Sequence, residues 1–523
     1  MFNRLIFLLL LLAGQAFAGD INFLVKTDEV VGSISPYVYG LNSQNPEGTG
    51  ASFRRAGGNR ATVYNWVTNY SNAGNDWHHV NDNWPCTVGG ATNCDEVGAQ
   101  QTNFILENQK AGLDTLMTVP MVDYVSADKD GEVTKDQTAP SSRFKKSVYQ
   151  KRGPFTLTPD PKTPVVYQDE FVNFLVNRFH TAAQGGVKFY ALDNEPDLWN
   201  DTHPRVHPEK TTYAEMADRS ERLASAILKV DPTAQILGFV SYGWHGYDTL
   251  QDAPDSKEDN AAYGTFIDYF LEKMKEAEKK NKKRLIHVLD LHWYPEVQAS
   301  GKRITNGDLS SASIDARLQA PRSLWDPTYK EKSWIGDSYG KPIQLIPLVQ
   351  QKIAEHYSGT KLAFTEYDYG AGNHVSGGLA QADVLGIFGK LGVFMASYWG
   401  DLKPYNKAAY QIYRNYDGKG GAFGSTEVSS ATEDVEESSI YAATDPRKPG
   451  TLWVMVLNKN QSASIHGKFK IEGKQAYQAY TAYGFDSHSP EIKLVKQDKV
   501  AGDHFDYSLP PLSATLFVCR SQQ

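Results

Sequence analysis

The chain has 523 residues, of which 41% are hydrophobic and 22% are charged, and its formal net charge is −8. This composition is typical of a globular protein and excludes intrinsic disorder, collagen and coiled coil. The acidic balance, without any long basic run, argues against nucleic acid as a partner. The length exceeds a typical domain of roughly 100–200 residues, so we expect a large barrel or more than one domain.

The first eighteen residues have the organisation of a secretory signal peptide. Arg4 precedes the apolar run Leu5–Ala13, and the small residues Ala16 and Ala18 suit a cleavage site. A run this short does not span a bilayer, and no later apolar stretch reaches 18 residues. We therefore expect residues 1–18 to be removed and the mature chain to be secreted, extracellular or periplasmic, with no membrane partner.

The three cysteines fit an exported protein. Cys86 and Cys94 lie close together in one Gly- and Asn-rich segment. In an oxidising compartment this spacing favours a local disulfide over two free thiols or half of a metal site. Cys519 lies in an apolar, strand-like run, where we expect a buried and unreactive thiol.

From residue 36 to about 405, short apolar runs alternate with amphipathic helical segments such as 168–184, 212–230 and 345–357. This pattern is typical of parallel strands joined by crossover helices. Eight strands favour an α/β fold of the TIM-like (β/α)₈ type over an open doubly wound sheet, and no Gly-rich phosphate loop follows any strand. The predicted strands are Val38–Asn42, Ser52–Ala56, Asp114–Met121, Lys188–Asn194, Ile236–Ser241, Val288–Tyr294, Lys361–Tyr367 and Val393–Trp399.

Residues 406–523 show a different pattern, with short alternating strands separated by turn residues, which predicts an antiparallel β-sandwich. Residues 19–35 are also strand-like, so we expect this smaller domain to be built from both chain ends. The Ser- and Glu-rich segment 425–439 is predicted to be a mobile loop. The predicted strands are Ile21–Val25, Glu29–Ile34, Ser439–Ala443, Thr451–Leu457, Ser464–Ile471, Ala476–Tyr483 and Ala514–Arg520.

Two glutamates stand at the ends of predicted barrel strands. Glu195 follows the fourth strand in Asp-Asn-Glu-Pro, and Glu366 ends the seventh in Thr-Glu-Tyr. Barrel enzymes hold their active sites at the C-terminal ends of the strands, so both carboxylates should share one rim. Glycoside hydrolysis needs such a pair, since one carboxyl group protonates the leaving oxygen and the other attacks the anomeric carbon. The structural alternative is that Glu195 caps a loop and Glu366 pairs with a lysine.

Further strand ends carry residues that suit this chemistry. Tyr294, after the sixth strand, is placed to hydrogen-bond Glu366, and Trp399, after the eighth, to form the floor of the site; a plain core role is the alternative for both. Either Arg55 or Arg60, after the second strand, is expected to hold the nucleophile in its charged form. The sequence pattern favours neither arginine over the other.

Six motifs occur in the order in which glycoside hydrolase family 44 carries them, and the chain resembles this family from about residue 36 to its end. The resemblance implies a retaining endo-β-1,4-glucanase, commonly active on xyloglucan and carboxymethyl cellulose, with Glu195 as acid/base and Glu366 as nucleophile. Some members bind calcium, but no compact Asp/Asn loop identifies a site here. The motifs are Tyr39-Gly-Leu-Asn42, Arg55-Ala-Gly-Gly-Asn-Arg-Ala-Thr-Val-Tyr-Asn-Trp66, Asn72-Ala-Gly-Asn-Asp-Trp77, Asp193-Asn-Glu-Pro196, Ser323-Leu-Trp-Asp-Pro327 and Thr365-Glu-Tyr-Asp-Tyr-Gly370.

Several tryptophans lie in predicted loops rather than in periodic core runs. Sugar rings stack their C–H faces on such side chains, while their hydroxyl groups need planar polar partners. Trp77 suits either a sugar contact or the anchoring of its own loop. The residues expected to bind substrate, besides those at the strand ends above, are Asn59, Asn194, Trp66, Trp325 and Trp334.

The sequence therefore predicts a secreted glycosidase that cleaves internal β-1,4-glucosidic bonds of xyloglucan or soluble cellulose derivatives. We expect it to act as a monomer and without a catalytic cofactor, while a structural calcium ion is compatible with the resemblance. The alternatives are a mannanase or xylanase on the same barrel and a non-catalytic carbohydrate-binding surface protein. The intact pair of carboxylates argues against the last, because binding alone needs neither.

Overall fold

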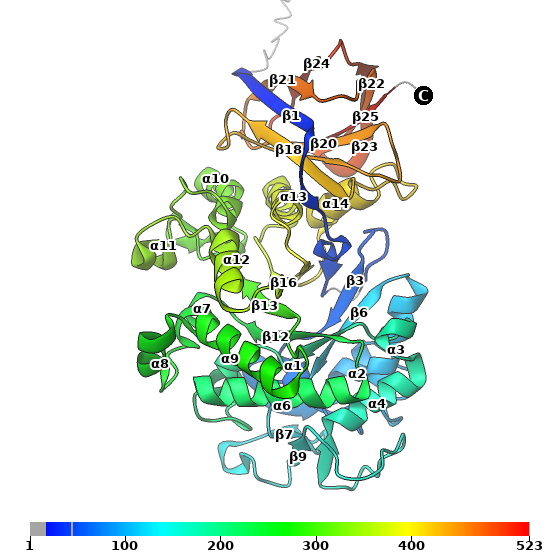
Figure 1. Ribbon diagram of the computed structural model, residues 1–523, viewed down its shortest axis with the longest axis vertical. Coiled ribbons are helices and arrows are strands. Elements are labelled where there is room, and N and C mark those ends of the chain that lie inside the picture. The colour runs from blue at the N-terminus through cyan, green and yellow to red at the C-terminus, as the bar shows by residue number, and fades with distance from the viewer. Residues whose placement is uncertain (1–16, 43–44, 522–523) are drawn as a thin grey trace, which may run out of the picture.

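The computed structural model describes residues 17–42 and 45–521. The predicted signal peptide lies outside these residues except for positions 17 and 18, which begin strand β1 (Phe17–Ser33). The described chain forms two parts, a barrel surrounded by helices and a sheet domain stacked on one side of it (Figure 1). Within this described part, no helix combines the length and apolar composition needed to cross a bilayer.

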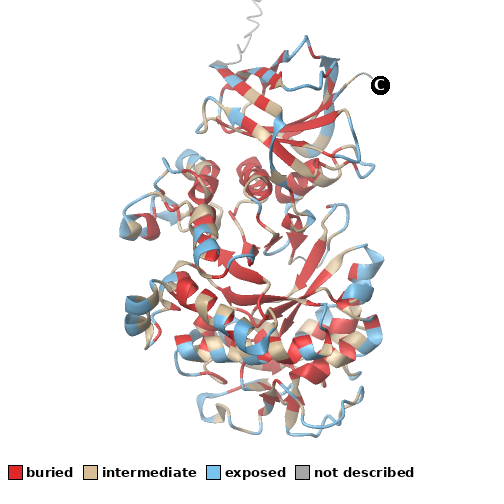
Figure 2. Ribbon diagram, in the orientation of Figure 1, coloured by how far each residue is buried: buried red, intermediate tan, exposed pale blue. Residues whose placement is uncertain are grey.

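Eight parallel strands close into a barrel in the order β11-β12-β13-β16-β17-β2-β3-β6. Each predicted barrel strand overlaps one of them, so the predicted TIM-like fold is confirmed. The apolar runs form strands here because their side chains are buried on both faces, inside the barrel and under the helices (Figure 2). The strands are β2 (Gly40–Leu41), β3 (Phe53–Ala56), β6 (Asp114–Val119), β11 (Phe189–Leu192), β12 (Gln235–Ser241), β13 (Val288–Trp293), β16 (Lys361–Tyr367) and β17 (Met395–Tyr398).

Amphipathic helices cover the outside of the barrel. In α6 (Tyr213–Val230), Met216, Leu223 and Ile227 are buried, and the Thr212 side chain caps the first turn by accepting a hydrogen bond from the Glu215 amide. The solvent-facing sides of these helices are exposed (Figure 2), except in α13 (Val375–Lys390), which is buried along almost its whole length. The other covering helices are α3 (Ala99–Lys110), α4 (Gln168–Phe179), α9 (Phe266–Asn281), α12 (Leu345–His356), α13 (Val375–Lys390) and α14 (Pro404–Arg414).

Short elements fill the connections that leave the C-terminal ends of the strands, the end at which barrel enzymes build their sites. They form the long segments between a strand and its covering helix. These elements are α1 (Asn59–Thr62), β4 (Ser71–Asn72), β5 (Val80–Asp82), α2 (Trp84–Val88), β7 (Tyr124–Ser126), β8 (Gly131–Glu132), β9 (Phe144–Val148), β10 (Val165–Tyr167), α5 (Trp199–Thr202), α7 (Trp244–Thr249), α8 (Ser256–Tyr263), β14 (Gln298–Ala299), β15 (Lys302–Arg303), α10 (Ser311–Gln319) and α11 (Trp334–Tyr339).

The second domain is a nine-stranded, mostly antiparallel sheet with the order β23-β22-β25-β20-β19-β18-β1-β21-β24. Strand β1 pairs with β21 in parallel and with β18 in antiparallel orientation, so both chain ends build this domain. Phe23 of β1 stacks on Phe469 of β21 with ring centroids 4.7 Å apart. The remaining strands are β18 (Thr426–Thr432), β19 (Ser438–Thr444), β20 (Thr451–Asn458), β21 (Ser464–Glu472), β22 (Ala479–Asp486), β23 (Ser489–Lys499), β24 (His504–Leu509) and β25 (Ser513–Arg520).

The predicted mobile loop at 425–439 is wrong, because its first half forms strand β18, held between β1 and β19, and its last two residues begin β19. Backbone hydrogen bonds along both edges hold β18 in the sheet, although its sequence lacks the hydrophobic pattern from which a strand is predicted. Its Glu427 side chain is buried, and burial raises the pKa of this carboxyl to about 8. Lys390 of α13 also donates to the Ser430 carbonyl at 3.0 Å, which ties the strand to the barrel.

Helix α13 forms much of the contact between the two domains. Gly386 leaves room for the ring of Tyr441 of β19, since a Cβ at this glycine would lie 2.3 Å from that ring. The Tyr441 hydroxyl donates to Asp383 at 2.5 Å, one turn earlier on the same helix. The missing side chain at Gly386 therefore lets Tyr441 of the sheet domain pack closely against this helix.

Candidate active site

The two predicted glutamates meet at the C-terminal rim of the barrel. Glu195 follows β11, and Glu366 lies near the end of β16. One carboxylate oxygen of each lies within 4.8 Å of the other, and a ring nitrogen of His292 lies within the same distance of both. The structure thus brings together two carboxyl groups that are far apart in the sequence.

The turn after β11 holds Glu195 in an unusual backbone conformation. Asp193 and Glu195 have φ values of 65° and 46°, in the left-handed region that non-glycine residues seldom adopt. Asp193 is buried and accepts hydrogen bonds from the Thr62 hydroxyl at 2.6 Å and the Met121 amide at 2.5 Å. These contacts fix the turn, and the Glu195 amide donates to the Val240 carbonyl at 3.0 Å.

Glu195 has the environment of a general acid. Its side chain is only 15% exposed. Burial raises the pKa of its carboxyl to about 7, with Arg55 opposing the rise and the charge of Asp76 adding to it. A carboxyl group with such a pKa keeps a substantial protonated fraction near neutral pH, as an acid catalyst requires.

Glu366 has the opposite environment. Arg55 donates to its Oε1 at 2.6 Å, and the Tyr294 hydroxyl donates to its Oε2 at 2.8 Å. A guanidinium ion pair and a phenol donor both favour the charged carboxylate. Arg55 also donates to the Asn194 side chain at 2.7 Å, which links the two glutamate loops.

The structure decides between the two arginines. Arg55 is buried and contacts Glu366 directly. Arg60 instead pairs with Asp82 at 2.5 Å and lies over the ring of Trp84. Arg55 therefore holds the Glu366 carboxylate, and Arg60 fastens the neighbouring loop.

Three polar residues around the site were missed by sequence reasoning. His292 is buried with its Nδ1 2.9 Å from Oε1 of Glu195, and burial lowers its pKa to about 3, so the ring is neutral. Asp290 and Asp197 are buried carboxyls, and desolvation raises their pKa values to about 7 and about 8. His292 stands in the predicted strand motif, but a single polar residue in a strand carries no pattern that reveals its role.

The candidate substrate residues fall into different environments. The amide of Asn194 donates to Asn59 at 3.2 Å, and Asn59 in turn donates to Asp76 at 3.0 Å. Trp399 is 38% exposed and lies against the loop after β3, where a Cβ on Gly58 would be 2.6 Å from its ring. These three residues lie in segments that follow barrel strands at the end that carries the glutamates, and they stay candidates for substrate contact.

The other tryptophans differ from one another. Trp334 is exposed and stacks on His245 with centroids 4.5 Å apart, Trp325 is partly buried against the core, and Trp77 is exposed. The prediction that Trp66 binds substrate is wrong: it is buried, stacks on Phe171 of α4 and donates from its indole to the Tyr167 carbonyl. Its loop lacks helical periodicity, yet the segment packs beneath α4.

The cysteine predictions are confirmed. Cys86 of α2 and Cys94 of the loop that follows it form a disulfide, with Cα atoms 5.9 Å apart. Cys519 is free and buried in β25, and burial raises the pKa of its thiol to about 12. Such a thiol is unreactive in the folded protein.

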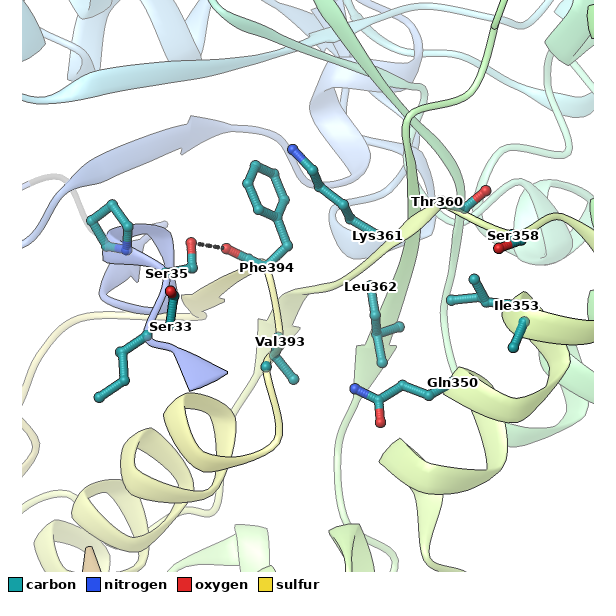
Figure 3. A pocket seen from close by; sticks show the side chains of 15 residues that line it. Ser33, Ser35, Gln350, Ile353, Ser358, Thr360, Lys361, Leu362, Val393 and Phe394 are labelled. Atoms are coloured by element: carbon teal, nitrogen blue, oxygen red, sulfur yellow. Dashed lines mark hydrogen bonds between the residues drawn. The ribbon is translucent and has the colours of Figure 1, made fainter. Parts of the chain in front are cut away.

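A separate pocket of about 570 Å³ lies where β16 and β17 begin, at the barrel end opposite the glutamates (Figure 3). Ser35, which donates to the Phe394 carbonyl at 2.6 Å, and Lys361 lie along its wall. No carboxylate or histidine lines this pocket. It therefore lacks the groups needed for acid–base hydrolysis.

Within the described residues, Glu195, His292 and Glu366 are the only three acidic, histidine or cysteine side chains close enough to face one ion. The Arg55 guanidinium, 2.6 Å from Glu366, already supplies the positive charge there and would repel a cation. This set does not fit calcium. No cluster of this kind among the described residues therefore supports the expected structural calcium ion. No catalytic step is derived through a metal.

Comparison with known proteins gives consistent matches. Residues 70–297 match the model of glycoside hydrolase family 44. Endoglucanase A of Paenibacillus lautus is 45% identical over 514 residues, which cover 97% of this chain and 73% of that protein. Beta-mannanase/endoglucanase A of Caldicellulosiruptor saccharolyticus is 44% identical over 91% of this chain but only 37% of its own length. The structure of a Paenibacillus polymyxa family 44 xyloglucanase with xyloglucan is 43% identical, with a TM-score of 0.94 over 96% of this chain and 100% of that one.

Proposed function

The chain belongs to glycoside hydrolase family 44, and from this premise we propose a retaining, endo-acting enzyme that cleaves β-1,4-glucosidic bonds. Glu195 serves as acid/base and Glu366 as nucleophile. The observation that carries this proposal is the short separation of the two carboxyl groups, with oxygens within 4.8 Å. Retaining enzymes hold the pair about 5–5.5 Å apart, whereas inverting ones leave roughly 6.5–9.5 Å for a water molecule.

In the first step, a carboxylate oxygen of Glu366 attacks the anomeric carbon while Glu195 gives its proton to the leaving oxygen. The bond from the anomeric carbon to that oxygen breaks, and a glycosyl ester of Glu366 forms. The raised pKa of Glu195 keeps the required proton on the acid near pH 7. Arg55 holds the Glu366 carboxylate in position for attack, and the Tyr294 hydroxyl bonds its other oxygen.

In the second step, the ionised Glu195 takes a proton from water as the water oxygen attacks the anomeric carbon. The ester bond to Glu366 breaks and its negative charge returns, next to the two donors that stabilise it. Two inversions leave the β-configuration unchanged. No cofactor is needed, since the two carboxyl groups supply both the nucleophile and the proton.

Xyloglucan is the substrate best supported, because a closely similar structure contains it. Exposed Trp399 and Trp334 offer flat apolar faces for sugar rings. Mannan is the second candidate, since one relative is named both mannanase and endoglucanase. A reducing-sugar assay on xyloglucan, carboxymethyl cellulose, mannan and xylan separates these; the greatest activity on mannan or xylan would overturn the glucan assignment.

Isosteric variants test the two roles. Glu195→Gln should lose about 10²–10⁴-fold in activity on polysaccharide, because the proton donor is gone. Glu366→Gln should be at least as inactive. Glu491→Gln, on the exposed strand β23, serves as the control for preparation and assay of the variants and should keep its activity. Proton NMR of the first product should show the β-anomer. An α-anomer, or full activity of either active-site variant, would contradict the assignment.

We also propose that residues 1–18 are removed on secretion, as the leader-like sequence and the disulfide favour; N-terminal sequencing of the exported protein checks this. For the domains, we propose that residues 19–35 join the C-terminal part in the sheet domain. The predicted limit at 405 falls within α14, where Gln411 and Arg414 donate to the carbonyls of Gly48 and Gly50 in the barrel. We therefore place the end of the catalytic domain after α14, which limited proteolysis can test.

A further inference from the structure

A chain of hydrogen bonds runs from Glu195 into the interior of the barrel. The Nδ1 atom of His292 lies 2.9 Å from Oε1 of Glu195. Its Nε2 lies 3.3 Å from the hydroxyl oxygen of Thr365. That hydroxyl donates to Oδ2 of Asp290 at 2.9 Å, and the Thr365 amide donates to Oδ1 at 3.3 Å. Neighbouring strands β13 and β16 supply the three inner residues.

The two ends of this chain differ in their access to water. The side chain of Glu195 is 15% exposed, whereas Asp290, His292 and Thr365 are fully buried. Asp290 has no ion pair among the described residues, and burial is the main cause that raises its pKa to about 7. Thr365 and His292 therefore link a proton on Asp290 to the partly exposed Glu195.

The directions of the hydrogen bonds link the two carboxyl groups. When Asp290 is ionised, the Thr365 hydroxyl donates to it, so the same oxygen accepts from the Nε2–H of His292. The Nδ1 atom of the neutral ring is then bare and accepts the proton of protonated Glu195. This arrangement favours the acid form of Glu195.

When Asp290 is protonated, every hydrogen bond in the chain reverses. Asp290 donates to the Thr365 oxygen, the Thr365 hydroxyl donates to Nε2 of His292, and Nδ1–H donates to ionised Glu195. Going from the first arrangement to the second moves each proton along one hydrogen bond. The net change is one proton lost by Glu195 and one gained by Asp290, and His292 stays neutral throughout.

We propose that Asp290 is a positioning residue that sets the protonation of Glu195 through the tautomer of His292. Ionised Asp290 favours Glu195 as an acid, and protonated Asp290 favours it as a base. This inference rests on the proposed acid/base role of Glu195. It gives a role to a buried carboxyl that makes no direct ion pair among the described residues, and it makes the two groups a coupled titrating pair.

Other charged groups also face these two carboxyls. Arg55 of β3 and Glu366 of β16 act on Asp290, with Tyr247 of α7 nearby. Glu195 is faced by Arg55, by Asp76 of the 3₁₀ turn Gly74–Asp76 and by Asp197 of the turn Pro196–Leu198, and by the phenols of Tyr242, Tyr247 and Tyr294. None of these is altered by removing the Thr365 hydroxyl, so a substitution there isolates the chain.

The test uses three variants and the pH dependence of kcat/KM on polysaccharide. Thr365→Val removes the hydroxyl at nearly constant volume, whereas Thr365→Ser keeps it. In Asp290→Asn, the side-chain oxygen can accept the hydrogen bond from the Thr365 amide, and the side-chain nitrogen can donate one to the Thr365 hydroxyl. This fixes the arrangement that favours ionised Glu195. The basic limb of the profile reports loss of the acid's proton and should lie near pH 7 in the wild type.

We expect the basic limb to move down by about one pH unit in Thr365→Val and in Asp290→Asn, and to stay in place in Thr365→Ser. Asp290→Asn should add no further shift in the Thr365→Val background. Circular dichroism and melting temperature show whether each variant folds. If Asp290→Asn does not fold, the comparison of Thr365→Val with Thr365→Ser still tests the proposal.

An unmoved limb in both Thr365→Val and Asp290→Asn, or equal shifts in Thr365→Val and Thr365→Ser, would overturn the proposal. The same series separates this failure from failure of the catalytic assignment. If Glu195→Gln stays active on polysaccharide, Glu195 is not the acid and the proposed function fails. If Glu195→Gln is inactive while the limb never moves, only the coupling through His292 is wrong.

Discussion

The hydroxyl of Tyr294 offers a sharp test of double displacement. It donates to Oε2 of Glu366 at 2.8 Å, while Arg55 holds Oε1. In the glycosyl ester, Glu366 carries no charge, and the second step restores it. Tyr294→Phe removes a donor to that returning charge, so hydrolysis of the intermediate should slow, whereas the first step, which consumes the charge, should not.

The size of the effect follows from the type of hydrogen bond. A bond to a charged group contributes about 1.5–3 kcal/mol. At about 1.36 kcal/mol for each tenfold change, kcat should fall by about 10- to 150-fold. An aryl glycoside with a good leaving group should release a burst of phenol equal to the enzyme concentration, followed by slow turnover.

Tyr367→Phe is the matched control. Tyr367 is buried one residue after Glu366, but its hydroxyl bonds to Gln381 and Tyr410 rather than to the nucleophile. Its loss should lower stability without producing a burst. If Tyr294→Phe shows no burst, or slows the first step as much as the second, the assignment of Glu366 as a nucleophile stabilised by Tyr294 is refuted.

The barrel was predictable from the sequence because each of its strands is buried on both faces and so reads as a short apolar run. Glu195 and Glu366 were identifiable because they follow such runs. Strands β18 and β23 were missed because they lack such an apolar run. β18 is rich in Ser and Thr, and β23 is a highly charged edge strand with mostly exposed side chains. Backbone pairing holds both in the sheet, and a hydrophobic pattern does not record it.

The polar interior was beyond sequence reasoning. Arg55 and Arg60 are equivalent in the motif, and only the closure of the barrel places one of them beside Glu366. Asp290 and Thr365 lie on neighbouring strands, and register alone makes their contact. Trp66 shows the converse error, since a loop position was taken for an exposed one. Burial of polar groups and loops is decided by tertiary packing, to which local periodicity is insensitive.

Three further predictions complete the set. In Glu195→Ala, azide should restore turnover of an activated aryl glycoside and give a β-glycosyl azide, whereas in Glu366→Ala it should give the α-product; identical products would refute the assigned roles. Replacing Cys86 and Cys94 with Ser should cost at most roughly 3 kcal/mol with activity largely retained, and thiol titration of the native wild type should find fewer than two reactive groups. Gly386→Ala in α13 should destabilise by about 1–3 kcal/mol in denaturant unfolding, because its Cβ would lie 2.3 Å from Tyr441. Gly389→Ala, where the nearest atom is 3.4 Å away in Ile34, should instead stabilise by up to about 1 kcal/mol, since alanine is the better helix former; equal effects at both sites would show that the Tyr441 contact does not set the approach of the two domains.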